Sequence, residues 1–254
     1  MAVVRYNVEN QVCTLTMDRP EALNAFDPEM MHDLCAAFLR ATDDAAVKVI
    51  VLTGAGRAFT AGADLKAMGN GKRDPGRHDF SDMLNAIVDC PKPFLIAANG
   101  LGVGVGMTIL GLADLAFVAA SSRFKAPFSS LGLTAEAGST YTFSRLMGPQ
   151  KASWVLLSAE WFSAAECVGM GLATQVVPDA QLLEFVYNEA STLAKLPLAS
   201  LMKTKELMMA PHIEAMKAAF DRENRGLAEL LGGAANKEAL SAFLEKREAD
   251  FSDI

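Results

Sequence analysis

The chain has 254 residues, of which 51% are hydrophobic, so one large domain with a sizeable core, or a domain with an extension, is within reach. A formal net charge of −7 argues against a surface built for nucleic acid or for an anionic membrane. Four scattered cysteines without a CxxC pair, and an N-terminus without the plan of a signal peptide, predict reduced thiols and a cytoplasmic protein.

The first half of the chain predicts strands that alternate with helices. Asp27 followed by Pro28 predicts a helix start, because aspartate caps free N–H groups and proline fits the first helical position. Residues 68–80 predict a polar loop. Strands are predicted at 2–8, 11–17, 47–53, 93–98 and 115–119, and further helices near 80–90 and 105–112. This rhythm is typical of a layered α/β domain.

After about residue 139 the pattern becomes helical. Helices are predicted at 139–146, 149–158, 163–170, 180–195, 199–209, 211–231 and 235–248. Thr174–Val177 is the one segment there that reads as a strand. We therefore divide the chain into a core over 1–195 and a C-terminal helical region over 196–254. The apolar stripes of that region need a partner surface, in the same chain or in a neighbouring subunit.

Residues 93–113 carry no charge over a length that could span a membrane. Pro93, Asn99 and several glycines interrupt this stretch, and Asp114 closes it. These residues predict a strand, a tight turn and a short buried helix in place of a membrane span.

Two apolar strands each run into a turn of glycines and other small residues. The strand at 47–53 leads into Gly54–Gly56 and Ala61–Asp64, and the strand at 93–98 leads into Asn99–Gly106. Residues this small let a backbone N–H group come close to a ligand. Two such N–H groups aimed at one point would hold an oxyanion, which suggests chemistry on a carbonyl compound.

Other motifs are weaker. The glycines at 100–106 do not fit G-x-G-x-x-G, and no phosphate-binding G-x-x-x-x-G-K-[ST] motif occurs. Ser200–Lys203 fits S-x-x-K but lies in an amphipathic helix without companion motifs. His32, His78 and His212 are expected to lie apart in different local settings, so no metal site or triad is built from them.

Glu136 stands among small and apolar residues, with no Lys or Arg between Lys125 and Arg145. A glutamate in such a place is usually exposed or caps a helix. If its carboxyl group is buried, desolvation raises its pKa and makes it a better base near neutral pH.

The sequence resembles the crotonase family, also called enoyl-CoA hydratase/isomerase, over essentially the whole chain. The markers, in chain order, are Asp18–Pro20, Leu23–Ala25, Gly56–Leu65, Ala98–Gly100, Ala113–Asp114, Phe124 and Ala242–Arg247. The resemblance implies a spiral of ββα repeats followed by a C-terminal helical trimerisation region. It also implies an acyl-CoA thioester substrate, so coenzyme A arrives with the substrate and no separate cofactor or metal is expected. The assembly implied is a homotrimer, or a hexamer built as a dimer of trimers.

The resemblance also assigns site residues. It gives the two oxyanion-binding N–H groups to Ala63 and Val105. The residues it places along the coenzyme A path are Ala22, Ala61, Asp64 and Leu65, with Lys66, Lys246 and Arg247 as candidates for the phosphates. For each of these three cations, a solvated surface charge is an equally good interpretation. Phe59, Phe128 and Leu131 are candidates for the acyl tunnel, or plain core residues.

The departures from the family pattern indicate the branch. Hydratases of the family carry two glutamates, and this sequence has Thr108 and Phe128 at those positions, neither of which activates water as a carboxylate does. The sequence around Glu136 is similar to the Δ3,Δ2-enoyl-CoA isomerases, whose single catalytic glutamate stands there. Alternatives are another crotonase-type reaction, such as weak hydration, and a non-catalytic acyl-CoA-binding subunit. The acidic balance opposes RNA binding.

Overall fold

The structure is a computed structural model, and it describes residues 2–64 and 76–254. Within these residues the larger sheet has the strand order β1-β2-β3-β5-β7-β10. Its strands are β1 (Val4–Glu9), β2 (Val12–Met17), β3 (Val49–Gly54), β5 (Phe94–Ala98), β7 (Leu115–Ala119) and β10 (Gln175–Val177). β1 pairs antiparallel with β2, and the other neighbours pair in parallel. The predicted strands are therefore confirmed, and the segment at 93–113 is part of the folded core.

A smaller sheet, with the order β4-β6-β8-β9 in the described residues, lies beside it. Its strands are β4 (Ala58–Thr60), β6 (Leu101–Val103), β8 (Arg123–Lys125) and β9 (Trp161–Ser163). β4, β6 and β8 each follow directly after a strand of the larger sheet. The chain thus repeats a unit of two strands, one in each sheet, with a helix after the first two of these pairs, which confirms the expected ββα spiral.

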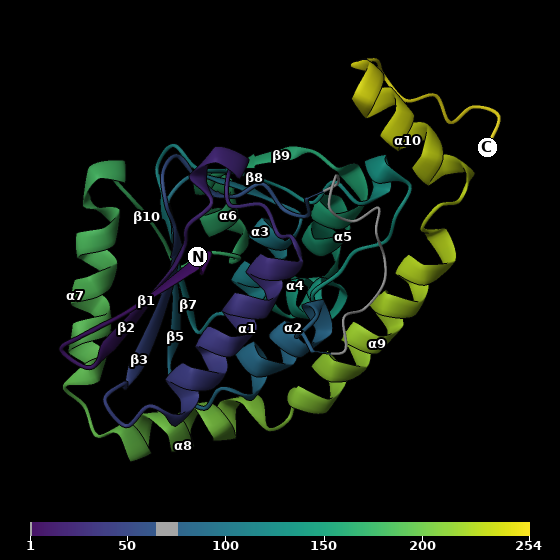
Figure 1. Cartoon of the computed structure of the whole chain (residues 1–254). Coiled ribbons are helices and arrows are strands. Elements are labelled where there is room, and N and C mark those ends of the chain that lie inside the picture. Colours follow the sequence, from purple (N-terminus) through teal and green to yellow (C-terminus); the bar gives the residue numbers. More distant parts are fainter. Residues whose placement is uncertain (1, 65–75) are drawn as a thin grey trace.

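Helices cover both faces of the larger sheet (Figure 1). On one face lie α1 (Pro28–Asp43) and α2 (Phe80–Asp89), and on the other α7 (Leu182–Ala194). Side chains of β3 alternate between these faces: Ile50 and Leu52 belong to the cluster under α1 and α2, whereas Val49 and Val51 belong to the cluster under α7. Asp27 accepts a hydrogen bond from the Met30 N–H at 2.8 Å, which confirms the predicted cap.

Two predicted elements differ from the structure. The helix expected at 105–112 is a short α3 (Val105–Thr108) that continues as a 3-10 turn, η3 (Ile109–Leu112). The expectation of a single strand after residue 139 is wrong, because β9 pairs antiparallel with β8 through Phe124 and Phe162. Three residues are too few to show alternation in a sequence. Part of the predicted loop at 68–80 lies outside the described residues.

The second half is otherwise helical, as predicted. Its helices are α4 (Ser139–Met147), α5 (Pro149–Ser158), α6 (Ala164–Met170), α7, α8 (Leu198–Met209), α9 (Ile213–Leu230) and α10 (Ala234–Glu245). α9 packs against α4 and α2, while α10 projects from the body (Figure 1). Among the described residues no helix has the length and apolar character needed to cross a membrane. The division between residues 195 and 196 stays a prediction.

Candidate active site

Two asparagine side chains hold the glycine turns together. Nδ2 of the fully buried Asn24 donates to the carbonyl oxygens of Ala58 and Phe59 at 2.9 and 3.2 Å. Oδ1 of Asn99, at the end of β5, accepts from the Gly54 N–H at 3.0 Å, and its Nδ2 donates to the Gly56 carbonyl at 2.9 Å. The polar residues of the sequence motifs thus anchor the turns that follow β3 and β5.

Ala63 lies in the first turn, where it forms an isolated parallel bridge with Phe26. The bridge uses the Gly62 carbonyl, which accepts from the Phe26 N–H at 2.7 Å, and the Asp64 N–H, which donates to the Phe26 carbonyl at 2.9 Å. Gly62 and Asp64, on either side of Ala63, thus make both hydrogen bonds of the bridge. In this parallel pattern the residue between two bonded neighbours points its own N–H away from the partner strand. The Ala63 N–H therefore faces away from Phe26, and Ala63 itself is exposed.

Val105 is the first residue of α3, and the first N–H groups of a helix have no acceptor within the helix. Gly104 precedes it with a φ of 56°, a conformation that favours glycine. The two turns touch: a Cβ added to Gly62 would lie 2.6 Å from the Val103 carbonyl oxygen. Ala63 and Val105 are the residues directly after Gly62 and Gly104, so the fold brings the two predicted N–H donors to one place.

Glu136 reaches the same helix from the chain between η4 (Ser129–Leu131) and α4. Its carboxyl group lies near the side chain of Thr108, the last residue of α3, whose hydroxyl donates to the Gly104 carbonyl oxygen at 3.3 Å. Burial raises the pKa of the Glu136 carboxyl to about 8; the negative charge of Glu223 adds to this rise, and the nearby Thr108 hydroxyl opposes it. The residue as a whole is half-buried, whereas its carboxyl group, which sets the pKa, is buried. The direction of this shift is the one expected for a buried carboxyl group.

Glu223 was not found by sequence reasoning. It lies on α9 with 4% exposure and accepts three hydrogen bonds, from the Gly138 N–H at 2.6 Å and from the Thr140 N–H and hydroxyl at 2.9 and 2.6 Å. Burial raises its pKa and these hydrogen bonds lower it. The sequence did carry one indication that Glu223 is buried. Glu223 stands four and three residues after Ala219 and Phe220, which places it on the same side of an amphipathic helix as these apolar residues.

The residues expected along the coenzyme A path divide into three groups. Ala22, in the 3-10 turn η1 (Pro20–Ala22), and Ala61 lie on adjacent segments, since the Ala61 N–H donates to the Leu23 carbonyl at 2.9 Å. Asp64 forms an ion pair with Arg19 at 3.5 Å. Leu65 and Lys66 lie outside the described residues.

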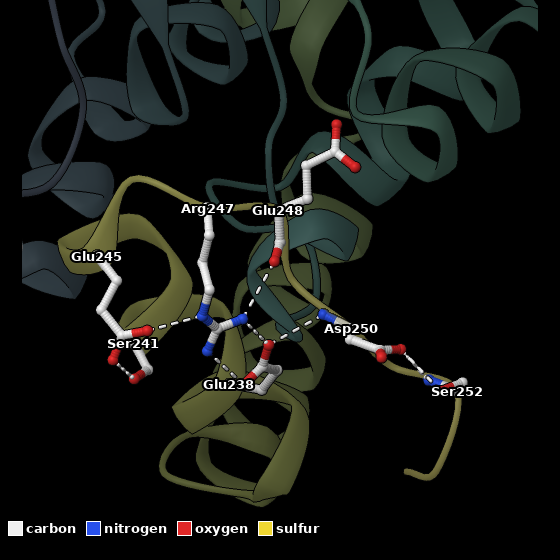
Figure 2. A network of polar contacts seen from close by, with 7 residues as sticks. All are labelled: Glu238, Ser241, Glu245, Arg247, Glu248, Asp250 and Ser252. Carbon is white, nitrogen blue, oxygen red and sulfur yellow. Dashed lines mark hydrogen bonds and ion pairs between the residues drawn. The ribbon is translucent and has the colours of Figure 1, made fainter.

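Lys246 and Arg247 follow directly after α10, the helix that projects from the body (Figure 1). Lys246 is exposed and has a φ of 56°. Figure 2 shows that Arg247 is paired with carboxylates of its own segment: Nε donates to Glu245 at 2.7 Å and Nη2 to Glu238 at 3.0 Å. The hydrogen bonds that Glu238 accepts from Arg247 and from the Asp250 N–H lower its pKa to about 2. Arg247 is thus already paired with carboxylates, which weakens its case as a phosphate ligand.

The expectation that the histidines lie apart is wrong for two of them. The rings of His32 and His78 stack with centroids 5.2 Å apart, and the His78 N–H donates to Nδ1 of His32 at 3.1 Å. They meet because α1 and the residues just before α2 lie side by side. His212 is elsewhere, with Nδ1 2.7 Å from the Tyr141 hydroxyl.

Phe59 and Phe128 are buried in the core cluster, and Leu131 is half-buried at η4. A groove of about 720 Å³ opens between the larger sheet and α7, where Val51, Leu182 and Tyr187 line it, and it reaches Gly54–Gly56 and Asn99 at the first glycine turn. None of Glu136, Ala63 and Val105 lines this groove. We therefore base the site on the meeting of the two turns with Glu136.

Comparison with known proteins agrees with this geometry. Residues 7–254 match the family described as enoyl-CoA hydratase/isomerase. A Rhodobacter capsulatus protein named "Probable enoyl-CoA hydratase" is 36% identical over 252 residues, which cover 98% of this chain and 97% of that protein. Enoyl-CoA delta isomerase 2 of Rattus norvegicus is 34% identical over 221 residues, which cover 85% of this chain and 56% of that longer protein.

A solved structure, the enoyl-CoA hydratase/isomerase from Pseudoalteromonas atlantica, superposes with a TM-score of 0.95 at 33% identity, covering 98% of this chain and 100% of that one. The chain therefore belongs to the enoyl-CoA hydratase/isomerase family, the crotonases, and is an enzyme of that superfamily. Its relatives carry both hydratase and isomerase names.

Proposed function

We propose that this protein is an acyl-CoA isomerase that moves the double bond of a 3-enoyl-CoA to give the trans-2-enoyl-CoA. The observation that carries the proposal is the arrangement of carboxylates. One carboxylate, that of Glu136, lies beside Thr108 at the end of α3, and Thr108 stands where a hydratase of the family would have a glutamate.

The reaction is a 1,3 proton transfer. The Glu136 carboxylate removes a proton from C2 of the substrate, which leaves a dienolate with negative charge on the thioester oxygen. The N–H groups of Ala63 and Val105 donate hydrogen bonds to that oxygen, and such donors typically contribute about 3 kcal/mol each to transition-state stabilisation. Glu136, now protonated, returns the proton at C4, so the enzyme ends in its starting state.

The pKa of Glu136 suits this role. A base that first takes and then returns a proton works best when its pKa lies near the working pH. With a pKa of about 8, roughly a tenth of Glu136 is carboxylate at pH 7. We therefore expect kcat/KM to rise about tenfold per pH unit up to the pKa, because the carboxylate is the active form.

The second carboxylate near Glu136 does not restore a hydratase site. Three of the about four acceptor sites of the Glu223 carboxylate receive hydrogen bonds from Gly138 and Thr140, and the residue is 4% exposed, so it has little capacity left to orient a water molecule. This is the main argument against hydration as the principal reaction. The hydratase name of the Rhodobacter capsulatus relative keeps another crotonase-type reaction as the second candidate. A non-catalytic acyl-CoA-binding role is the alternative if no turnover is found.

The substrate and assembly proposals follow from the family. Ala22, Ala61 and Asp64 would contact coenzyme A mainly through their backbone, and Leu65 and Lys66 would extend this path. We also propose a homotrimer or hexamer, supported by exposed apolar side chains on the C-terminal helices: Leu207, Met208, Phe243 and Leu244. Closed symmetry would let Lys246 reach a neighbour's phosphates.

The test is incubation with a 3-enoyl-CoA while the absorbance of the conjugated enoyl thioester is recorded. The expected result is rapid conjugation by the wild-type protein and little by Glu136→Gln. Crotonyl-CoA hydration on the same preparation is the comparison. Comparable rate constants for the two reactions, or no conjugation at all, would overturn the proposal.

A further inference from the structure

The turn that carries Glu136 has an unfavourable backbone. Ala137 and Gly138 follow it with φ angles of 57° and 70°, both in the left-handed region. An alanine rarely adopts this conformation, because its Cβ approaches the neighbouring carbonyl oxygen. Such a conformation persists where contacts elsewhere hold it.

Those contacts come from α9. Gly138 is the N-cap residue of α4 and has no side chain with which to cap the helix. The Glu223 carboxylate supplies the cap from 85 residues away in sequence, with bonds of 2.6 Å from the Gly138 N–H and 2.9 Å from the Thr140 N–H. A carboxylate at a helix N-terminus satisfies N–H groups that have no partner within the helix and interacts favourably with the helix dipole.

The packing around the turn agrees with this cap. A Cβ added to Gly138 would lie 2.6 Å from Cε1 of Phe220, on the same helix as Glu223. Ser139 lies between Gly138 and Thr140, the two residues that donate to Glu223. The Ser139 N–H and hydroxyl donate to the carbonyl oxygen of Glu136 at 3.1 and 2.7 Å. The hydrogen bonds of Glu223 are therefore connected to the backbone of Glu136 through one intervening residue.

We propose that Glu223 is a positioning residue, which holds the Glu136–Thr140 turn so that the Glu136 carboxylate stays beside Thr108 at the end of α3. The inference rests on the proposed function for the role of Glu136. It gives α9, in the C-terminal helical region, a part in the active site of its own chain.

The charge of Glu223 has a second consequence. Among the described residues, the charged group that acts on Glu136 is Glu223, and the Thr108 hydroxyl is the polar group beside the Glu136 carboxyl. Burial raises the pKa of Glu223 in turn, whereas the polar groups of Gly138 and Thr140 and the positive charge of Arg222, on the same helix, lower it. Because like charges disfavour each other, the negative charge of Glu223 makes Glu136 hold its proton to higher pH.

The principal variant is Glu223→Gln, and the matched control is Glu229→Gln, an exposed residue on the same helix with the same change of charge. The glutamine amide has one acceptor in place of two, so it cannot receive the N–H groups of both Gly138 and Thr140. Amide hydrogen exchange at these two positions should become at least about tenfold faster in Glu223→Gln and stay unchanged in the control.

The second measurement is the pH midpoint of the kcat/KM profile, which partial loss of structure alone would not shift. In Glu223→Gln the acid-side midpoint should move to lower pH by about half a unit or more, since a like charge is removed. kcat should fall about tenfold with a smaller change in KM, as expected for a base held less well in place. Thr140→Val removes one hydrogen bond but keeps the charge, so exchange should rise without a shift of the midpoint.

Unchanged exchange and an unchanged midpoint in Glu223→Gln would overturn the inference. If that variant does not fold, Glu223→Asp replaces it: the shorter side chain keeps the charge but does not reach both N–H groups, so exchange should rise while the midpoint stays. If the wild-type protein turns over no 3-enoyl-CoA, the proposed function fails, whereas the exchange comparison still decides whether Glu223 holds the turn.

Discussion

Replacement of Glu136 by glutamine should remove activity and, at pH 8, stabilise the fold. Burial raises the pKa of this carboxyl from its ordinary 4.5 to about 8. Between these values the unfolded chain releases the proton and the folded protein retains it. The unfolded state therefore binds fewer protons, and the contribution of Glu136 to stability falls as the pH rises through this range.

The magnitude follows from the two pKa values. One pKa unit corresponds to about 1.4 kcal/mol, so at pH 8 the buried carboxyl costs the folded state up to about 4 kcal/mol, and at pH 5 less than about 1 kcal/mol. Glutamine has a similar shape and no charge, so this cost disappears in Glu136→Gln. The stability difference between variant and wild type should thus be about 3 kcal/mol more favourable at pH 8 than at pH 5.

The assay is thermal unfolding of both proteins at pH 5 and pH 8, alongside isomerase turnover. For a protein of this size the expected gain is on the order of 5–10 °C in Tm at pH 8 relative to pH 5. Turnover should fall by at least about 100-fold, the usual contribution of a positioned general base. Glu160→Gln, at an exposed position, is the control and should show neither effect.

A Tm difference that is the same at both pH values would refute the argument that the carboxyl is desolvated. Near-normal turnover in the variant would remove Glu136 from the mechanism, whatever its effect on stability.

Three further predictions concern the rest of the site and the assembly. Hydration of crotonyl-CoA should be slower than isomerisation of a 3-enoyl-CoA by at least about 100-fold, because Thr108 and Phe128 replace the hydratase carboxylates; equal rate constants would contradict this. Gly62→Ala should lower both Tm and kcat, since its φ is 85° and the new Cβ would meet the Val103 carbonyl, displacing Ala63; an unchanged kcat would argue against an oxyanion role for that turn. Light scattering should give a trimer or hexamer, and a mass near 27.1 kDa at micromolar concentration would rule this out.

Much of the fold could be predicted from the sequence alone, because its signals are local. Asp27 and Pro28 mark the start of α1, and apolar runs mark the strands of the larger sheet. The glycine turns and Glu136 stand out for the same reason, because each is a short local pattern in the sequence. The family resemblance added the order of the motifs along the whole chain.

Tertiary structure decided the features that depend on residues far apart in sequence. The strands of the smaller sheet have three residues each, which is too short to show a periodic pattern in the sequence, and they form because they pair with one another. His32 and His78 stack because α1 and the residues just before α2 lie side by side. Glu223 reads in the sequence as one glutamate on an amphipathic helix, and only the packing of α9 against α4 buries it on the turn that follows Glu136. The pKa of Glu136 likewise depends on burial and on that neighbouring charge, which no local pattern encodes.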